Sequence, residues 1–288
     1  MPYPHPRSGR PQADAAPALA RRVERLRDIA RAEPRLEGVL LYGSWTLGEA
    51  DAYSDIEAYV FVRDEAADGF DGRAFLAQLA PLELAYTNMF GILAVVFDDL
   101  MRGEFHFEPA SEGIPRMDSW QGMVHLPEPE AAVLLDRDGR LTEAASRLAR
   151  PLAPEPRATA QRLADELANW TLMLAHVLGR GETARAHALL QTMVAPQQLQ
   201  LCRLLRSSTE HWLTPSRALE ADLPERDRRR HAATTGPAEP RAVRTAAVRS
   251  WEWSRELIAE AAGRWGTRVP GTLHDRIAAL LASGRDGD

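Results

Sequence analysis

The chain contains no lysine, so all 35 of its basic side chains are arginine. This absence excludes the Walker A loop, whose lysine reaches the β- and γ-phosphates of a nucleotide. It also excludes the strand lysine of protein kinases and every lysine Schiff base. If the protein handles a triphosphate, any side-chain cation that contacts it is therefore expected to be an arginine.

Cysteine and long apolar runs are also scarce. The single cysteine, Cys202, excludes a disulfide framework and a cysteine-based metal cluster, and it fits a reducing cytoplasm. Its leucine neighbours predict a small buried residue and not a nucleophile. No apolar run approaches the length of a membrane-spanning helix, so no membrane partner is expected. The Pro- and Arg-rich start predicts a disordered tail over residues 1–14, not a signal peptide.

The remaining composition is that of a globular protein. Apolar residues make up 45% and charged residues 26% of the 288 positions, which suits one large domain or two ordinary ones. The net charge of −6 divides into −9 for residues 1–150 and +3 for residues 151–288. An acidic half and a basic half are together suited to bind a cation and an anionic ligand, as in a metal–nucleotide complex. The overall acidity argues against broad nucleic-acid binding.

Hydrophobic periodicity divides the chain into two parts. Strands are predicted in the first part over residues 38–42, 56–62, 93–97 and 104–107, with helices over 15–32 and 70–80. Helices are predicted in the second part over residues 157–178, 182–207, 239–265 and 272–282, with an interruption at Pro196. The interpretation is an α+β fold: a domain over residues 15–140 with a β-sheet and flanking helices, followed by a helical bundle over residues 150–285.

The segment that carries chemistry is residues 41–62. A predicted strand ends at Gly43 and Ser44, and a second begins directly after Asp55. Asp55 and Glu57 are two positions apart, so both carboxylates project from one face of the strand and are suited to share Mg²⁺. Gly43 permits a close approach of the backbone, and Ser44 adds a hydroxyl beside N–H groups that bind phosphate. These parts suit the metal-assisted transfer of a nucleotidyl group.

Taken singly, the parts of this segment have ordinary explanations. An acidic pair on a strand is most often a solvated face, and Gly-Ser before a helix is usually a cap. Their conjunction in this order, with a second glycine at Gly48 and with Ser54 before the acidic pair, is far rarer. It resembles the signature of the nucleotidyltransferase superfamily of the DNA polymerase β type.

The resemblance extends to antibiotic nucleotidyltransferases. Together with residues 96–107 and 180–185, the motif is similar to that of lincosamide nucleotidyltransferases, which have a helical C-terminal domain. The resemblance implies a nucleotidyltransferase domain with a mixed sheet. It also implies a cytoplasmic, homodimeric enzyme that transfers AMP from ATP to a hydroxyl of a lincosamide such as lincomycin or clindamycin. Pyrophosphate is released, and the modified drug is inactive, which confers antibiotic resistance.

The resemblance also implies roles for the carboxylates. Asp55 and Glu57 would bind Mg²⁺, and Glu104 would act as the general base that takes the proton of the acceptor hydroxyl. Asp98 and Asp99 are rivals for the base, but their place at a strand end favours a turn.

The implied ligand contacts come from other segments. Gly43, Ser44 and Ser54 would bind the nucleotide, and Arg180 and Arg185 would clamp the triphosphate, unless they only form a surface turn between helices. A further pair lies on one predicted strand, where one residue would line the acceptor pocket while the other packs inside: His106 and Phe107. For a lone histidine, a structural role is the competing explanation.

Two alternatives remain open at this stage. The first is an aminoglycoside nucleotidyltransferase, because the acidic first half suits a polycationic acceptor. The second is a non-catalytic protein that keeps the fold, such as a toxin–antitoxin component. Such relatives usually lose one of the three carboxylates, whereas Asp55, Glu57 and Glu104 are all present.

Overall fold

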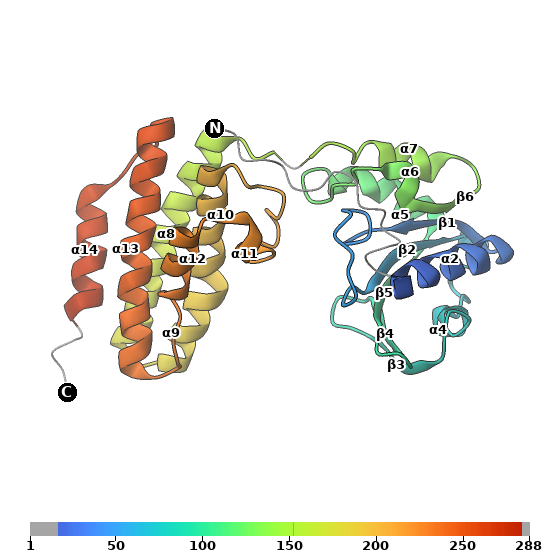
Figure 1. Ribbon diagram of the computed structural model, residues 1–288, viewed down its shortest axis with the longest axis horizontal. Coiled ribbons are helices and arrows are strands. Elements are labelled where there is room, and N and C mark those ends of the chain that lie inside the picture. Colours follow the sequence, from blue (N-terminus) through green and yellow to red (C-terminus); the bar gives the residue numbers. More distant parts are fainter. Residues whose placement is uncertain (1–16, 152, 284–288) are drawn as a thin grey trace. The chain divides into compact units, whose positions relative to one another are not determined.

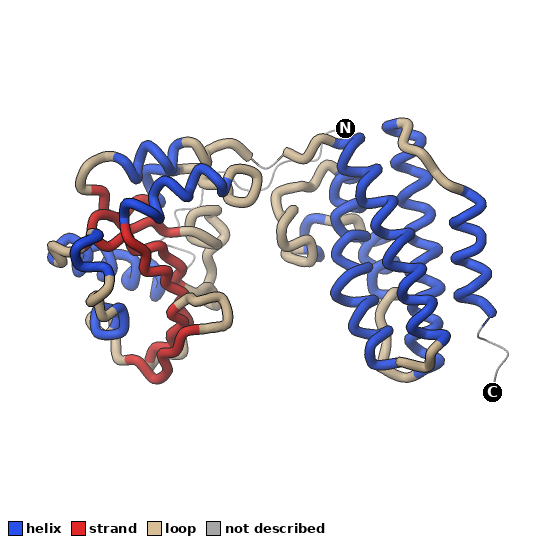
Figure 2. Tube along the Cα trace, turned by 180° about the vertical axis from the view of Figure 1, so that it is seen from behind, coloured by secondary structure: helices blue, strands red, loops and turns tan. Residues whose placement is uncertain are grey.

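The computed structural model describes residues 17–151 and 153–283, so the predicted N-terminal tail lies outside the described residues. Its contacts divide the chain into two compact units, Met1–Pro151 and Leu152–Asp288. The N-terminal unit combines strands and helices, and the described part of the C-terminal unit is helical (Figure 2). The predicted α+β fold class with a helical C-terminal part is confirmed.

The N-terminal unit is built on one mixed sheet with the strand order β3-β4-β5-β2-β1-β6 (Figure 1). Neighbouring strands are antiparallel except β2 and β5, which run parallel. The strands are β1 (Leu36–Leu41), β2 (Ile56–Val62), β3 (Leu82–Thr87), β4 (Leu93–Phe97), β5 (Arg102–Pro109) and β6 (Val133–Asp136).

Helices cover both faces of this sheet. The first face packs against α2 and α4, and the second against α5, η1, α6 and α7. The helices of this unit are α2 (Pro17–Ala32), α3 (Asp64–Ala67), α4 (Gly72–Leu76), α5 (Ala110–Arg116), the 3-10 helix η1 (Met117–Trp120), α6 (Pro129–Ala132) and α7 (Arg140–Ser146).

Alternation along the strands assigns side chains to these two layers. In β2, Ile56, Ala58 and Val60 face the first layer, whereas Phe61 faces the second together with Leu40 of β1. The second core cluster takes strand residues from β1, β2 and β6; of the described residues, it contains none from β3, β4 or β5. On the second face of the sheet, the helices therefore pack on β1, β2 and β6 and, among the described residues, share no core cluster with β3, β4 or β5.

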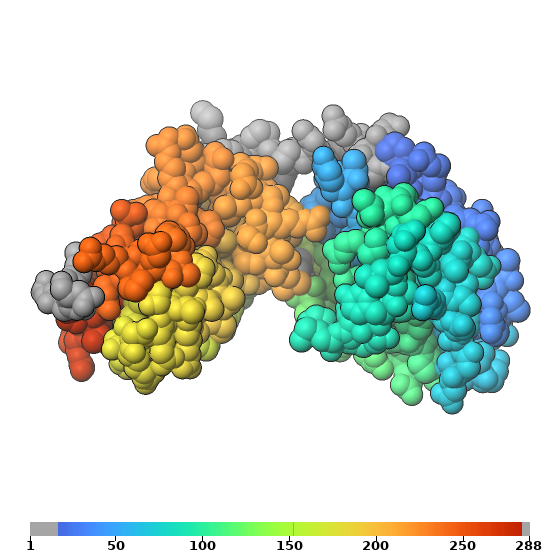
Figure 3. Space-filling view, turned by 90° about the horizontal axis from the view of Figure 1, so that it is seen from below, coloured from blue at the N-terminus to red at the C-terminus, as the bar shows by residue number. Residues whose placement is uncertain are grey.

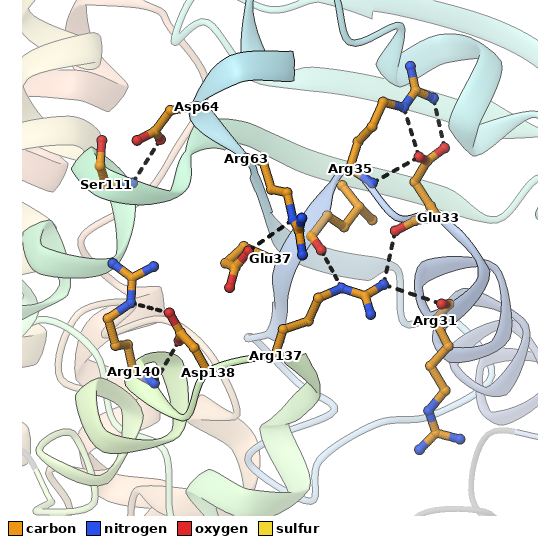
Figure 4. Close-up of polar contacts among 11 residues, drawn as sticks. Arg31, Glu33, Arg35, Glu37, Arg63, Asp64, Ser111, Arg137, Asp138 and Arg140 are labelled. Carbon is orange, nitrogen blue, oxygen red and sulfur yellow. Dashed lines mark hydrogen bonds and ion pairs between the residues drawn. The ribbon is translucent and has the colours of Figure 1, made fainter.

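Hydrogen bonds and an ion pair fix the position of the beginning of β1 (Figure 4). Arg137, directly after β6, donates to the carbonyl oxygen of Leu36 at 2.7 Å and to those of Glu33 at 3.1 Å and Arg31 at 3.3 Å. Arg63 Nε lies 3.2 Å from Glu37 Oε2. These contacts join α2, β1 and β6 at the end of β1 that lies away from Gly43.

The helix predicted over residues 70–80 is shorter in the structure. It is the five-residue helix α4, whose start is capped by Asp71, which accepts from the Ala74 N–H at 2.9 Å, and turns follow at residues 77–79. Two strands, β3 and β6, had not been predicted.

The C-terminal unit follows the predicted helices closely. Its elements are α8 (Pro156–Gly179), α9 (Thr183–Leu189), the π-helix η2 (Leu190–Val194), α10 (Ala195–Arg206), α11 (Leu219–Asp222), α12 (Glu225–Ala232), α13 (Pro240–Trp265) and α14 (Gly271–Ala282). The predicted interruption at Pro196 is confirmed: a π-turn directly precedes it, since proline has no N–H to continue the α-helical ladder.

The core of this unit is aromatic and leucine-rich. Trp251 and Trp253 of α13 are almost fully buried, and so is Cys202 of α10, as predicted for a small core residue. Of the helices in the described ranges, none is both apolar enough and long enough to cross a bilayer.

Candidate active site

The parallel pairing of β2 with β5 brings the predicted carboxylates together. In this register Glu57 lies directly opposite Glu104, and Ile56 lies opposite Gly103. Directly opposed residues project from the same face of a sheet. Asp55 precedes β2 by one residue, so its neighbour on β5 is Arg102. The three predicted acidic side chains are therefore gathered at the starts of two adjacent strands.

A cation that the sequence interpretation had missed lies among these carboxylates. Arg102 Nη1 is 3.6 Å from Asp55 Oδ2, and Arg102 Nη2 is 3.2 Å from Glu104 Oε1. The guanidinium thus bridges two of the three carboxylates. The signal was present in the sequence, because Arg102 and Glu104 are two positions apart on a strand and share a face.

Gly43 makes room for the third carboxylate. Its φ of +75° is a left-handed conformation, and an added Cβ would overlap Glu57 Oε2. The close approach predicted at Gly43 is therefore made by the side chain of Glu57. Glycine is the residue that tolerates both the left-handed backbone and the close approach of the Glu57 side chain.

The two predicted serines differ in their surroundings. Ser44 Oγ is buried and has no hydrogen-bond partner among the described residues. Ser54 Oγ donates to Asp51 Oδ1 at 3.1 Å and accepts from the Asp51 N–H at 2.9 Å. Ser44 is therefore available for a ligand, whereas Ser54 holds the loop that precedes β2.

Aromatic side chains form the wall beside the carboxylates. Tyr42 Oη lies 3.2 Å from His106 Nε2, and the His106 ring stacks on Tyr59 with centroids 4.0 Å apart. Tyr59 in turn contacts Trp120, with centroids 4.5 Å apart. Neither Tyr42 nor Tyr59 had been assigned a role from the sequence.

Burial keeps this aromatic wall uncharged. It lowers the pKa of His106 below its ordinary value, so the imidazole is neutral at pH 7. Burial also raises the pKa of Tyr42, and the negative charges of Glu57, Tyr59, Glu104 and Asp55 raise it further. All three carboxylates thus act on the Tyr42 phenol, which stays protonated.

The two residues of the predicted acceptor pocket lie on opposite faces of β5. His106 belongs to the aromatic wall, and Phe107 packs against Phe70 and Phe75 with centroids 5.6 and 6.3 Å apart. The structure therefore brings His106, and not Phe107, to the carboxylates. This matches the expectation that one of the pair faces inward.

The rival acidic residues form a turn, as predicted. Asp98 and Asp99 follow β4. Asp99 accepts from Arg22 at 2.9 Å and from the Met101 N–H at 3.1 Å. Both oxygens of Asp99 are thus engaged in local contacts.

The donor chemistry fits a magnesium ion. Asp55, Glu57 and Glu104 supply carboxylate oxygens, which Mg²⁺ prefers, and Mg²⁺ usually takes only one or two carboxylates and completes its shell with water and substrate phosphates. Within residues 17–151 and 153–283, no group of three or more His, Cys, Asp or Glu side chains is placed so that it could hold a metal ion by itself. The set therefore suits an ion that arrives with a nucleotide.

The two predicted triphosphate ligands belong to the C-terminal unit. Arg180 is an exposed residue directly after α8. Arg185 lies in α9, where its Nη1 is 3.0 Å from Glu182 Oε2. Their contact with a triphosphate stays a prediction.

The C-terminal unit matches a known family. The model of the lincosamide nucleotidyltransferase-like, C-terminal domain matches residues 157–279, from the first turn of α8 into α14. The C-terminal unit is similar to this family. The match covers less than half of the chain and lies outside the unit that carries the carboxylates. It confirms the predicted resemblance to lincosamide nucleotidyltransferases and, with it, the class of enzyme.

Other comparisons give weaker likenesses. No curated protein matches the chain. An aminoglycoside 6-adenyltransferase from Bacillus subtilis is 12% identical over 92% of this chain and 99% of its own, with a TM-score of 0.43. A nucleotidyltransferase-like protein from Exiguobacterium sibiricum is 11% identical over 91% of this chain and 88% of its own, with a TM-score of 0.37. At these scores neither likeness bears on fold or function.

Proposed function

We propose that the protein is an ATP- and Mg²⁺-dependent O-nucleotidyltransferase whose acceptor is a lincosamide antibiotic. The observation that carries this proposal is the register of β2 and β5, which aligns Glu57 with Glu104 beside Asp55. The match of the C-terminal unit to the lincosamide nucleotidyltransferase-like family model supports the choice of acceptor.

In the proposed reaction, the acceptor oxygen attacks the α-phosphorus of ATP. A bond forms between these atoms, the bond from the α-phosphorus to the bridging oxygen breaks, and pyrophosphate leaves. Glu104 takes the proton of the acceptor hydroxyl. Asp55 and Glu57 would hold Mg²⁺, which, when bound, supplies positive charge to the phosphate oxygens.

The turn after β1 is suited to hold the phosphates. The unpartnered Ser44 hydroxyl and the left-handed Gly43 lie beside Glu57. Arg180 and Arg185 are proposed to contact the triphosphate as well, since the chain has no lysine to do so. The protein is proposed to act as a cytoplasmic homodimer.

The decisive experiment is a transfer assay. The protein is incubated with MgATP and, separately, with lincomycin, clindamycin and several aminoglycosides, and mass spectrometry looks for the addition of AMP. We expect adducts on the lincosamides together with released pyrophosphate. Adducts on aminoglycosides alone would show that the acceptor is wrong, and no pyrophosphate with any acceptor would show that the enzyme assignment is wrong.

Variants then test the roles of the carboxylates. Asp55→Ala and Glu104→Ala are each expected to reduce transfer by about a hundredfold or more, which is the scale of general acid–base contributions. Asp99→Ala is the matched control, because its carboxylate pairs with Arg22. If Glu104→Ala keeps its rate while Asp99→Ala is inactive, the base has been misassigned.

A further inference from the structure

Two rows of side chains cross the sheet face that carries the carboxylates. In the first, Glu57 lies opposite Glu104, Glu104 opposite Ala94, and Ala94 opposite Tyr86. In the second, Arg102 lies opposite Val96, and Val96 opposite Leu84. Because opposed residues share a face, each row is charged on β2 and β5 and apolar on β4 and β3. We call the apolar part, made of Leu84, Tyr86, Ala94 and Val96, the apolar strip.

The apolar strip is open at the edge strand β3, whereas Ala94 of β4 is only 7% exposed. Leu84 and Tyr86 are 49% and 52% exposed, although both are large apolar side chains. Among the described residues, no side chain of β3, β4 or β5 belongs to the core cluster that the helices form on this face. In Figure 3 the segment that includes β3 and β4, coloured cyan to teal, lies at the surface of the N-terminal unit.

The apolar strip also lacks charge. Ala85 faces the other side of the sheet, where it pairs with Val95 of the first core layer, and Glu83 lies at the register shift between Leu82 and Leu84. With neighbouring strands about 4.8 Å apart, Tyr86 lies two strand spacings, about 10 Å, from Glu104. A small apolar surface thus begins directly beside Glu104.

The sheet order separates this surface from the phosphate-binding turn. Gly43 and Ser44 follow β1, which borders β2 on the side away from β5, whereas the apolar strip lies beyond β5. In an in-line displacement the attacking and leaving oxygens lie on opposite sides of the phosphorus. When the phosphates are bound at the turn, the acceptor therefore approaches the α-phosphorus from the side of β4 and β3.

From this arrangement we infer that the apolar strip binds the uncharged, apolar body of the acceptor while its reacting hydroxyl lies at Glu104. The inference deepens the proposed function and rests on it. It assigns Leu84 and Tyr86 as specificity-determining residues that favour hydroxyl compounds with an apolar body over polycations. A second copy of the chain is a poor occupant, because a stable interface covers about 800 Å² on each partner and the strip is about 7 by 5 Å between its backbone positions.

The test uses binding as well as transfer. Tyr86→Ser, Leu84→Ser and the double variant are compared with wild type by titration calorimetry without ATP, using clindamycin as the apolar probe and kanamycin as the polycation. Each single variant is expected to weaken clindamycin binding about tenfold, since each loses most of a buried apolar side-chain contact. In the transfer assay the KM for clindamycin rises while the KM for MgATP stays unchanged.

Thr87→Ala is the matched control. Thr87 is on the same edge strand but faces the other way, opposite Leu93 of the first core layer. It tests whether any loss comes from weakening β3 and not from losing the contact. We expect its clindamycin affinity to equal that of wild type, and thermal unfolding checks that every variant is folded.

Several outcomes overturn the inference. They are a folded double variant with wild-type clindamycin affinity, a wild type that does not bind clindamycin, and variants that change only the oligomeric state in light scattering. Failure of the proposed function has a different signature. In that case wild type binds clindamycin, Tyr86→Ser weakens this binding, and no AMP adduct forms. The apolar strip would then still be a binding surface, but the transferase assignment would be refuted.

Discussion

Replacing Gly43 with alanine separates the stability of the fold from the geometry of the site. Gly43 has a φ of +75°, and a left-handed conformation costs a non-glycine residue about 1–2 kcal/mol. The new Cβ would overlap Glu57 Oε2, which is the far end of a flexible side chain. The overlap is therefore relieved by turning the carboxylate away, and the fold survives. We expect a fall in Tm of about 2–8 °C and a loss of AMP transfer of about a hundredfold.

Gly48→Ala is the control for this prediction. Gly48 lies in the same turn with a φ of +68°, and no heavy atom lies within 4 Å of its added Cβ. It should lower Tm by a similar amount in circular dichroism while keeping transfer within a few-fold of wild type. If Gly43→Ala transfers AMP at the wild-type rate, or if Gly48→Ala is equally inactive, the proposed position of Glu57 in the site is refuted.

Three further predictions follow from buried and charged groups. Arg102→Gln should bind Mn²⁺ about three- to tenfold more tightly in electron paramagnetic resonance titrations, because a positive charge that pairs with Asp55 and Glu104 is removed. Arg35→Gln, directly before β1, should leave Mn²⁺ affinity unchanged. Burial lowers the pKa of His106 and His274, so their unfolded forms bind protons first as the pH falls below about 6.5. The free energy of unfolding should therefore fall between pH 7.5 and 5.5 in urea titrations and fall less in His106→Gln; equal slopes would contradict this. Burial raises the pKa of Cys202 to about 12, so the native thiol should resist a disulfide reagent at pH 8 and react only after unfolding.

The local parts of the site could be predicted from the sequence because they depend on short-range rules. The strand over residues 56–62 has the predicted bounds, and the spacing of Asp55 and Glu57 fixes their common face. The four long helical segments of the C-terminal unit could be predicted equally well, because their apolar positions repeat with the helical period.

The remaining parts depend on pairing between distant segments. The sequence does not specify that β5 lies beside β2 in parallel with Glu57 opposite Glu104, since each strand has an apolar face that fits several neighbours. Strand β3 was missed because, as an edge strand, it exposes the adjacent residues Glu83 and Leu84 and so lacks a strict alternation of buried and exposed positions. Without β3 the open apolar strip is not visible. The role of Arg102 was overlooked for the same reason, because its two carboxylate partners come from two strands.

The parallel pair of β2 and β5 has a consequence for folding. The chain completes α3, α4, β3 and β4 before β5 returns to β2. Pairings that close such long loops form late, because the entropy of closure is lost before the contact is gained. Glu57 and Glu104 are therefore expected to meet after the local β3–β4 hairpin has formed. Protection of the β5 amides from hydrogen exchange and recovery of transferase activity should appear together during refolding.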